Sequence, residues 1–284
     1  MTIGEILIQG AGILASRPTP RLDAELVLGS MMGLTREQLF CSCDKTIGEA
    51  YSSRFFDFME QVKSGKPVSY ITRSKEFFGR NFYVDERVLI PRPETEMIVE
   101  QAVEHVGVLG LASPRILDLG CGSGCIGLSL ALELPYARVT LADVSPDALE
   151  VTTMNAERLG LLENVKILES DLLSNLLDQE FDVIVTNLPY IGTKIHHVVS
   201  EDVDKYEPSL ALYGGDDGLV LYKKLFQQIL TRKSLPKCII GEFGFGQSDD
   251  VFSLLNTFFE HKASSIQMLP DLAGIDRVFV VSFL

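Results

Sequence analysis

The spacing of apolar residues divides the chain into an N-terminal part with helical periodicity and a longer part in which strand-like and helical patterns alternate. Within residues 3–14, apolar side chains recur every three or four positions, which is typical of an amphipathic helix. Thr2 and Glu5 provide the Ser/Thr-x-x-Glu/Gln signal that starts many helices. We therefore expect residues 1–72 to form a small helical bundle.

The same start signal occurs twice more in this region, as Thr35 with Gln38 and as Thr46 with Glu49. Residues 46–64 are expected to form a helix with one apolar face, made by Ile47, Tyr51, Phe55, Phe56, Met59 and Val62. The aromatic residues of this face are predicted to be buried between the helices of the bundle.

After residue 72 the helical period gives way to shorter, strand-like runs. The stretch "EFFGRNFYV" predicts two short strands around Gly79-Arg80, which together form a β-hairpin. We assign this hairpin to a connecting segment at residues 73–93. Pro93 suits the first position of a helix, so the next helix is expected from Glu94 to Val106.

From residue 115 onward, strand-like runs alternate with helical patterns. The runs are Arg115–Leu119, Ala137–Ala142, Val165–Leu168, Phe181–Thr186, Cys238–Phe243, Ser265–Leu269 and Arg277–Phe283. Helices are expected between the first five runs and again at 247–259, which predicts an open parallel sheet covered on both faces. The segment 270–276 is too short for a crossover helix, so the final strand is expected to be antiparallel.

Composition and charge limit the classes of function. The 284 residues are 46% hydrophobic and 23% charged, as in soluble globular proteins with a substantial core. The formal net charge is −14, and no cluster of Lys and Arg suggests a surface for a phosphate backbone. Nucleic acid is therefore disfavoured as the main partner.

The five cysteines indicate neither disulfides nor a metal site. They contain no CxxC pair and have no nearby His in metal-ligand spacing, and the adjacent His196 and His197 do not complete a ligand set. We expect no metal and reduced thiols in a cytoplasmic protein. The apolar run "ILIQGAGILAS" follows no basic residue and contains Glu5, so it does not resemble a secretory signal, and no run reaches the ~18 residues of a membrane span.

A glycine-rich loop follows the first predicted strand of the sheet. In "ILDLGCGSGCIGLSLA", Asp118 leads Gly120, Gly122 and Gly124 in a D-x-G-x-G-x-G pattern that opens a helix. Glycine lets the backbone turn sharply and lets a ligand lie against it. Asp118 itself is expected either to orient the loop or to meet an ammonium group of the ligand.

Two further acids follow the next strands and narrow the class of ligand. Asp143 ends the second strand, where a carboxylate can accept both ribose hydroxyls of an adenosine. Asp171 is expected to end the third strand, where it could accept from the adenine amino group. A dinucleotide pyrophosphate requires G-x-G-x-x-G geometry, whereas the spacing here is G-x-G-x-G. This spacing and the antiparallel last strand favour S-adenosylmethionine. The predicted fold class is α/β, with a Rossmann-like seven-stranded methyltransferase sheet at residues 94–284.

The fourth predicted strand ends in Asn187-Leu188-Pro189-Tyr190. Ligands of doubly wound sheets bind beyond the carboxyl ends of the strands, so this stretch is expected to face the methyl donor. The Asn187 side-chain oxygen and the Leu188 carbonyl can hold the two N–H groups of an amide or amino nitrogen. Pro189 stiffens the turn and Tyr190 supplies a flat face. Without the donor site, the same residues would be interpreted as a strand end, a proline turn and a core tyrosine.

These stretches together resemble the bacterial-type release factor glutamine methyltransferases, the HemK/PrmC family. The family pattern Asn-Pro-Pro-Tyr occurs here as Asn-Leu-Pro-Tyr. The similarity extends to the stretches "RLDAELVLG", "PVSYITRSKEFFG", "LIPRPETE", "EPSLALYGGDDGL", "EFGFGQ" and "DLAGIDRV", and so covers nearly the whole chain.

The resemblance implies methylation of the side-chain amide nitrogen, N5, of glutamine in the Gly-Gly-Gln loop of class 1 peptide chain release factors. Asn187 and the Leu188 carbonyl would hold this amide, with Pro189 and Tyr190 beside it. S-adenosylmethionine, which leaves as S-adenosylhomocysteine, would contact Asp118, Gly120, Cys121, Gly122, Ser123, Gly124, Asp143, Asp171, Leu172 and Asn187. The segment from Arg92 to Glu96 would border the donor pocket. The N-terminal helices would dock the release factor.

Three alternatives remain at this point. A DNA adenine-N6 methyltransferase shares Asn-Pro-Pro-Tyr but predicts a basic face. A non-catalytic S-adenosylmethionine-binding regulator is compatible with Leu188 in place of the family proline, and a dinucleotide oxidoreductase is compatible with a glycine-rich loop. We expect a monomer that binds neither nucleic acid directly nor a membrane.

Overall fold

The computed structural model describes residues 1–194 and 200–283. Its contacts divide the chain into two compact units. The first unit comprises Met1–Ser74 and the segment that contains α9 (Glu201–Tyr206), and the second begins at Lys75.

The first unit is a helical bundle. Its other helices are α1 (Ile3–Ile13), α2 (Pro20–Met32), α3 (Arg36–Phe40), α4 (Glu49–Lys63) and α5 (Val68–Thr72). Residues from α1, α2 and α4 form most of its buried core, including Ile6, Val27 and Phe55. No helix in the described ranges is long and apolar enough to cross a membrane.

Two of the three predicted helix starts are confirmed. Reciprocal capping boxes link Thr2 with Glu5 and Thr35 with Gln38. The start at Thr46 is wrong, because Gly48 is the N-cap of α4 and Thr46 pairs with Thr2 in an isolated β-bridge.

The predicted apolar face of α4 is confirmed only in part. Phe55, Met59 and Val62 are buried, whereas 52% of Tyr51 is exposed. A tyrosine can remain near the surface because its hydroxyl can bond to water.

The second unit begins with the predicted hairpin, β1 (Lys75–Phe77) and β2 (Arg80–Phe82), which pair antiparallel. Its two-residue turn, Phe78-Gly79, has positive φ at both positions, 50° and 69°, as a type I′ turn requires. The short helix η1 (Pro93–Thr95) then leads into α6 (Glu96–Val108).

A seven-stranded sheet forms the centre of the second unit. Its strands are β3 (Arg115–Leu119), β4 (Arg138–Asp143), β5 (Val165–Glu169), β6 (Val183–Thr186), β7 (Cys238–Glu242), β8 (Ser265–Pro270) and β9 (Asp276–Ser282). The strand order is β5-β4-β3-β6-β7-β9-β8, and β9 runs antiparallel to both of its neighbours. The predicted α/β class with an antiparallel last strand is confirmed.

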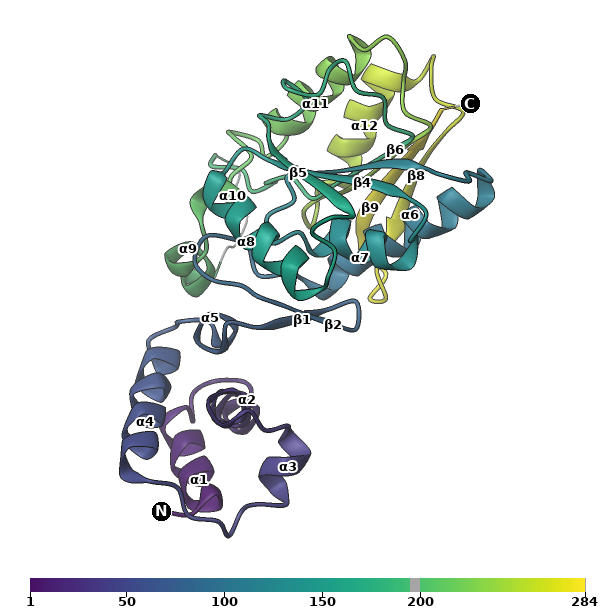
Figure 1. The fold of residues 1–284 in the computed structure, drawn as a ribbon. Coiled ribbons are helices and arrows are strands. Elements are labelled where there is room, and N and C mark those ends of the chain that lie inside the picture. Colours follow the sequence, from purple (N-terminus) through teal and green to yellow (C-terminus); the bar gives the residue numbers. More distant parts are fainter. Residues whose placement is uncertain (195–199, 284) are drawn as a thin grey trace. The chain divides into compact units, whose positions relative to one another are not determined.

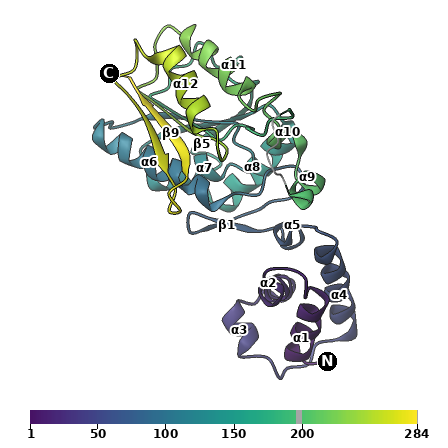
Figure 2. The same cartoon turned by 180° about the vertical axis from the view of Figure 1, so that it is seen from behind.

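Helices cover both faces of this sheet (Figure 1). Figures 1 and 2 show α6, α7 and α8 on one face and α11 and α12 on the other. The additional helices of this unit are α7 (Cys125–Glu133), α8 (Pro146–Arg158), α10 (Ser209–Leu212), α11 (Val220–Leu230) and α12 (Ser248–Phe259).

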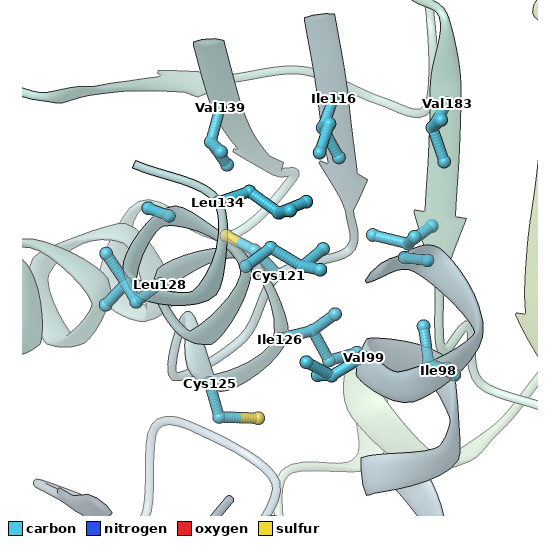
Figure 3. Close-up of a cluster of buried hydrophobic side chains, with 14 of the residues drawn as sticks. Ile98, Val99, Ile116, Cys121, Cys125, Ile126, Leu128, Leu134, Val139 and Val183 are labelled. Carbon is cyan, nitrogen blue, oxygen red and sulfur yellow. The ribbon is translucent and has the colours of Figure 1, made fainter. Parts of the chain in front are cut away.

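Successive strand residues point to opposite faces and so divide the core into two layers. On one face Ile116, Val139 and Val183 pack towards Val99 of α6 and Ile126 of α7 (Figure 3). On the other face Leu117, Ile184 and Ile239 join residues of α11 and α12. Burial on both faces explains why the strands read as continuous apolar runs.

One predicted helix is absent. Residues 172–178, between β5 and β6, form consecutive turns. Leu172 has φ 50°, its carbonyl accepts from the Ser170 hydroxyl (2.6 Å), and the Leu173 N–H donates to Gln228 Oε1 of α11 (2.8 Å). These bonds give the backbone the partners that a helix would otherwise provide.

Two glycines of α1 provide a matched test of the helical core. A Cβ at Gly10 would lie 2.6 Å from the ring of the fully buried Phe55, whereas nothing lies within 4 Å of a Cβ at Gly12. We expect Gly10→Ala to cost about 1–3 kcal/mol of stability through overpacking. Gly12→Ala should be neutral or stabilising by up to about 1 kcal/mol. Thermal unfolding followed by circular dichroism compares the two; equal midpoints would contradict the packing described.

Candidate active site

A cavity of about 420 Å³ lies at the carboxyl ends of β3, β4 and β6. This is the place where a doubly wound sheet binds ligands, because the chain order reverses at β3. Ten of the residues predicted for the site line it: Gly120, Cys121, Gly122, Ser123, Asp143, Asp171, Leu172, Asn187, Leu188 and Pro189. Asp118, Gly124 and Tyr190 do not.

The glycine loop between β3 and α7 has the backbone that its sequence predicts. Gly120, Gly122 and Gly124 have φ of 72°, 56° and 79°, values that side chains with a Cβ rarely adopt. Thr152 of α8 donates to the Gly122 carbonyl (2.8 Å) and fixes the middle of the loop.

Asp143 ties the second strand to this loop. Its Oδ2 accepts from the Gly122 N–H and its Oδ1 from the Ser145 N–H, both at 2.9 Å. Burial raises the pKa of this carboxyl, while the N–H groups oppose the increase. Each oxygen has a second lone pair, so the carboxylate can also accept hydroxyl groups of a ligand in the cavity.

Asp118 is fully buried beneath the loop. Its Oδ2 accepts from the Gly127 N–H in α7 (2.7 Å), and its Oδ1 has no hydrogen-bond partner among the described residues. Burial, with a smaller contribution from the charge of Asp143, raises the pKa of Asp118 to about 7. Of the two roles expected from the sequence, this geometry supports orientation of the loop and helix.

The third acid is at the rim of the cavity and already has a cation. Asp171 Oδ2 lies 2.6 Å from Lys224 Nζ of α11, and both side chains are about half exposed. The neighbouring Leu172 is buried and contributes an aliphatic wall. The role of Asp171 towards an adenine stays a prediction, and Lys224 is a residue that the sequence did not indicate.

The Asn187–Tyr190 stretch contributes to the cavity unevenly. Asn187 donates through Nδ2 to Thr95 Oγ1 (3.2 Å), and Thr95 also lines the cavity. The Tyr190 hydroxyl donates to Glu242 Oε1 (3.1 Å) and does not reach the cavity lining. Burial, followed by the nearby Glu242 charge, raises the pKa of Tyr190 well above its usual range. Its predicted contact with a substrate stays a prediction.

The stretches "YGGDDGL" and "EFGFGQ" pack against the turn formed by Asn187–Tyr190. Gln247 donates to the Tyr190 carbonyl (2.9 Å) and accepts from the Gly244 N–H (2.8 Å). A Cβ at Gly214 would lie 2.2 Å from the Pro189 carbonyl oxygen, and one at Gly218 would lie 2.1 Å from that of Tyr190. Glycine permits this close approach of two backbone segments because it has no Cβ.

The segment before α6 forms another wall, and of the expected segment 92–96 only Arg92 and Thr95 are among the residues that line the cavity. Arg92 Nη2 lies 2.6 Å from Glu207 Oε1, and Glu207 Oε2 accepts from the Ile90 N–H (3.1 Å). Glu207 is buried and anchors this wall, a role that the sequence did not indicate.

Within residues 1–194 and 200–283, no group of three or more His, Cys, Asp or Glu side chains is arranged to hold a metal ion. His196 and His197 lie outside the described residues. The five cysteines are free, and Cys121, Cys125 and Cys238 are buried.

The doubly wound sheet and the glycine loop define a Rossmann-like methyltransferase fold. Residues 95–225 match the family model of the methyltransferase small domain, and residues 5–72 match that of the PrmC N-terminal domain. Proteins named release factor glutamine methyltransferase are 40% identical over 267 residues in Chlorobaculum tepidum and 36% identical over 280 residues in Bacillus subtilis. The alignment with the Chlorobaculum tepidum protein covers 91% of this chain and 88% of that protein. The alignment with the Bacillus subtilis protein covers 97% of this chain and 96% of that protein. The chain belongs to the release factor glutamine methyltransferase family, as the resemblance implied.

Solved structures confirm the fold at low sequence identity. The catalytic domain of hMettl16 in complex with the MAT2A 3′UTR hairpin 6 has a TM-score of 0.59 at 16% identity, over 85% of this chain and 94% of that one. The N-terminal domain of human METTL16 in complex with SAH has a TM-score of 0.54 at 18% identity, over 79% of this chain and 84% of that one. These similarities concern the fold alone.

The buried Asp118 predicts a pH dependence of stability. Its pKa is raised from an ordinary 3.8 to about 7, so at intermediate pH the folded chain keeps a proton that the unfolded chain has lost. Stability contributed by this proton is present at low pH and is lost as the pH rises towards 7, by an amount on the order of a few kcal/mol. Asp118→Asn, which does not titrate, should show a smaller decrease in the unfolding midpoint between pH 5 and pH 8.

Calorimetry without any added ligand measures these midpoints. The exposed Asp178→Asn variant serves as the control and should keep the slope of the wild type. If the wild type and Asp118→Asn have the same slope, the burial of an uncompensated carboxylate at this position is contradicted.

Proposed function

We propose that this chain transfers a methyl group from S-adenosylmethionine to the side-chain amide nitrogen of the glutamine in the Gly-Gly-Gln motif of peptide chain release factors. Family membership supports this reaction, since relatives over nearly the full length carry the name release factor glutamine methyltransferase. The structural observation that carries it is that Asn187 and Leu188 line the same cavity as the glycine loop and Asp143.

The cavity fits a ligand of this kind. Its volume of about 420 Å³ lies within the range of small-molecule sites. Asp143 would accept the ribose hydroxyls, Gly120 and Gly122 would let the ligand lie against the backbone, and Leu172 would contact the base. When bound, S-adenosylmethionine supplies an electrophilic methyl group on a cationic sulfur.

The protein's own contribution is to hold and orient the substrate amide. The lone pair of an amide nitrogen is delocalised, which makes the nitrogen a poor nucleophile. Asn187 Oδ1 and the Leu188 carbonyl would accept its two N–H groups and favour a tetrahedral nitrogen with its lone pair directed at the methyl group. No strong base is required at this step, because the proton can leave after transfer. Positioning and preorganised dipoles therefore provide most of the acceleration.

Leu188 in place of the family proline is compatible with this role. The residue is expected to act through its carbonyl, which leucine also has. Its side chain is 3% exposed and would lie 3.2 Å from a Cβ at Gly120, so packing supports the turn.

The release factor is the proposed partner, and the helical unit is the proposed docking module. We further propose a monomer that makes no direct contact with nucleic acid, supported by the net charge of −14. The DNA adenine methyltransferase and the dinucleotide oxidoreductase have no support among the relatives described above.

Incubation with labelled S-adenosylmethionine tests the substrate. The intact release factor should be labelled, and its Gln→Ala variant in the Gly-Gly-Gln motif should not, because the acceptor nitrogen is missing. Label on neither protein would contradict the proposal, and label on both would place the acceptor elsewhere. Equilibrium dialysis with the donor and with nicotinamide dinucleotides separates loss of donor binding from loss of transfer.

Asn187→Ala should lower kcat by about 10²–10³, because one of the two preorganised acceptors is lost. Asn164→Ala removes an exposed asparagine outside the cavity and should leave kcat unchanged. Steady-state methylation of the release factor measures both. An Asn187→Ala variant with the kcat of the wild type would show that this side chain does not hold the amide.

A further inference from the structure

Behind Asn187, outside the residues assigned above to the reaction, lies a buried carboxylate. Glu242 ends β7 and is 2% exposed. Its Oε2 accepts from Thr95 Oγ1 (2.5 Å) and its Oε1 accepts from the Tyr190 hydroxyl (3.1 Å). The Tyr222 hydroxyl donates to the main-chain carbonyl of the same residue. Three separate segments of the chain therefore converge on Glu242.

Thr95 connects this carboxylate to Asn187. A threonine hydroxyl has one hydrogen, and here it is directed at Glu242. Towards Asn187 the Thr95 oxygen can then only accept, and it accepts from Asn187 Nδ2 at 3.2 Å. The carboxamide of Asn187 is thereby held with its nitrogen at Thr95, which leaves Oδ1 as the atom that can accept from a ligand.

We propose that Glu242, acting through Thr95, is a positioning residue that determines which atom of the Asn187 carboxamide faces the substrate amide. The inference rests on the proposed function, in which Asn187 Oδ1 accepts an N–H group of glutamine. An amide oxygen and an amide nitrogen have nearly the same shape, so packing alone selects weakly between the two orientations. An ionised carboxylate selects strongly, because it accepts hydrogen bonds and cannot donate them.

The charge of Glu242 is essential to this arrangement. A protonated Glu242 can donate to Thr95, which frees the Thr95 hydrogen to bond to Asn187 Oδ1. The carboxamide would then turn its NH₂ group towards the NH₂ group of the substrate, so that two donors face each other and the amide is not held.

The surroundings of Glu242 bring this protonation closer to neutral pH. Burial is the main cause that raises the pKa of Glu242, and the charge of Glu94 adds to it. Hydrogen bonds from Thr95 and Tyr190 and the charge of Arg277 oppose the increase. The other titratable groups that face this carboxyl are Tyr222 and Cys125. Activity should therefore be present above the pKa of Glu242 and be lost as the pH falls through it.

Substitutions at Thr95 test the connection without removing any buried charge. Thr95→Val keeps the shape and removes the hydroxyl, whereas Thr95→Ser keeps the hydroxyl. We expect Thr95→Val to lower kcat for release factor methylation by about 10²-fold, with KM for the donor little changed, and Thr95→Ser to restore most of the rate. Thr257→Val removes a hydroxyl that donates to the Ser253 carbonyl within α12, and this variant should have the kcat of the wild type.

Glu242→Gln tests the charge. Its amide can donate to Thr95 as a protonated carboxyl does, so the variant should have low kcat at every pH and lack the acidic decrease that the wild type shows. Donor binding measured by calorimetry should stay near that of the wild type. If Glu242→Gln does not fold, the comparison of Thr95→Val with Thr95→Ser still tests whether the Thr95 hydroxyl positions Asn187. A Thr95→Val variant with the kcat of the wild type, or equal losses in Val and Ser, would overturn the proposal.

A readout that does not need activity separates this inference from the proposed function. With ¹⁵N-labelled asparagine, the Asn187 NH₂ resonance, assigned by its loss in Asn187→Asp, should exchange slowly in the wild type and faster in Thr95→Val. Unchanged exchange would contradict the hydrogen bond to Thr95. If the wild type transfers no methyl group to a release factor but the exchange differs, the proposed function fails and the positioning of Asn187 stands.

Discussion

The candidate active site depends on one physical constraint: polar groups next to a sheet that is buried on both faces must find partners inside the protein. Glu242 illustrates it most directly. A carboxylate that is 2% exposed would be costly without partners, and Thr95 and Tyr190 both donate to it. These donors come from segments far apart in the sequence. Satisfying the buried charge therefore fixes the relative positions of the segments that surround the cavity.

The same constraint acts on Asp143 and Asp118, the two acids next to the glycine loop. Asp143 accepts two backbone N–H groups, one of them from the glycine loop, so its position and that of the loop are set together. Asp118 has one partnered and one unpartnered oxygen among the described residues, and burial raises its pKa. Strand-end carboxylates in this protein thus organise the backbone and are not only candidate ligand contacts. Burial in these structural positions raises their pKa values, so the shifts do not indicate a role in proton transfer.

Close backbone packing is the second means by which the cavity is shaped. The Pro189 and Tyr190 carbonyl oxygens face Gly214 and Gly218 at distances that no side chain with a Cβ would permit. The turn that contains Leu188 is therefore enclosed by backbone on one side and open to the cavity on the other. This arrangement explains why a chain with leucine in place of the second residue of Asn-Pro-Pro-Tyr keeps the turn: neighbouring segments supply the rigidity that a second proline would add.

Local and periodic features could be predicted from the sequence because they depend on nearby residues. The capping boxes of α1 and α3, the hairpin at Gly79, the strand runs and the glycine loop with Asp143 are of this kind. Predictions that required distant partners were less accurate. Thr46 carried a start signal but pairs with Thr2. Residues 172–178 form turns in place of the predicted helix, because Ser170 and Gln228 bond to the backbone of this segment.

By itself, the sequence determined the α/β architecture, the antiparallel last strand and the family, since hydrophobic period, connection length and motif spacing are properties of the chain order. Only the tertiary structure decided that Thr95, Asn187 and Glu242 form one hydrogen-bonded series, that Glu207 anchors Arg92, and that Lys224 pairs with Asp171. These pairs join residues separated by dozens of positions or more. These contacts form because the sheet brings its strand ends together. They cannot be predicted from the pattern of residues that are neighbours in the sequence.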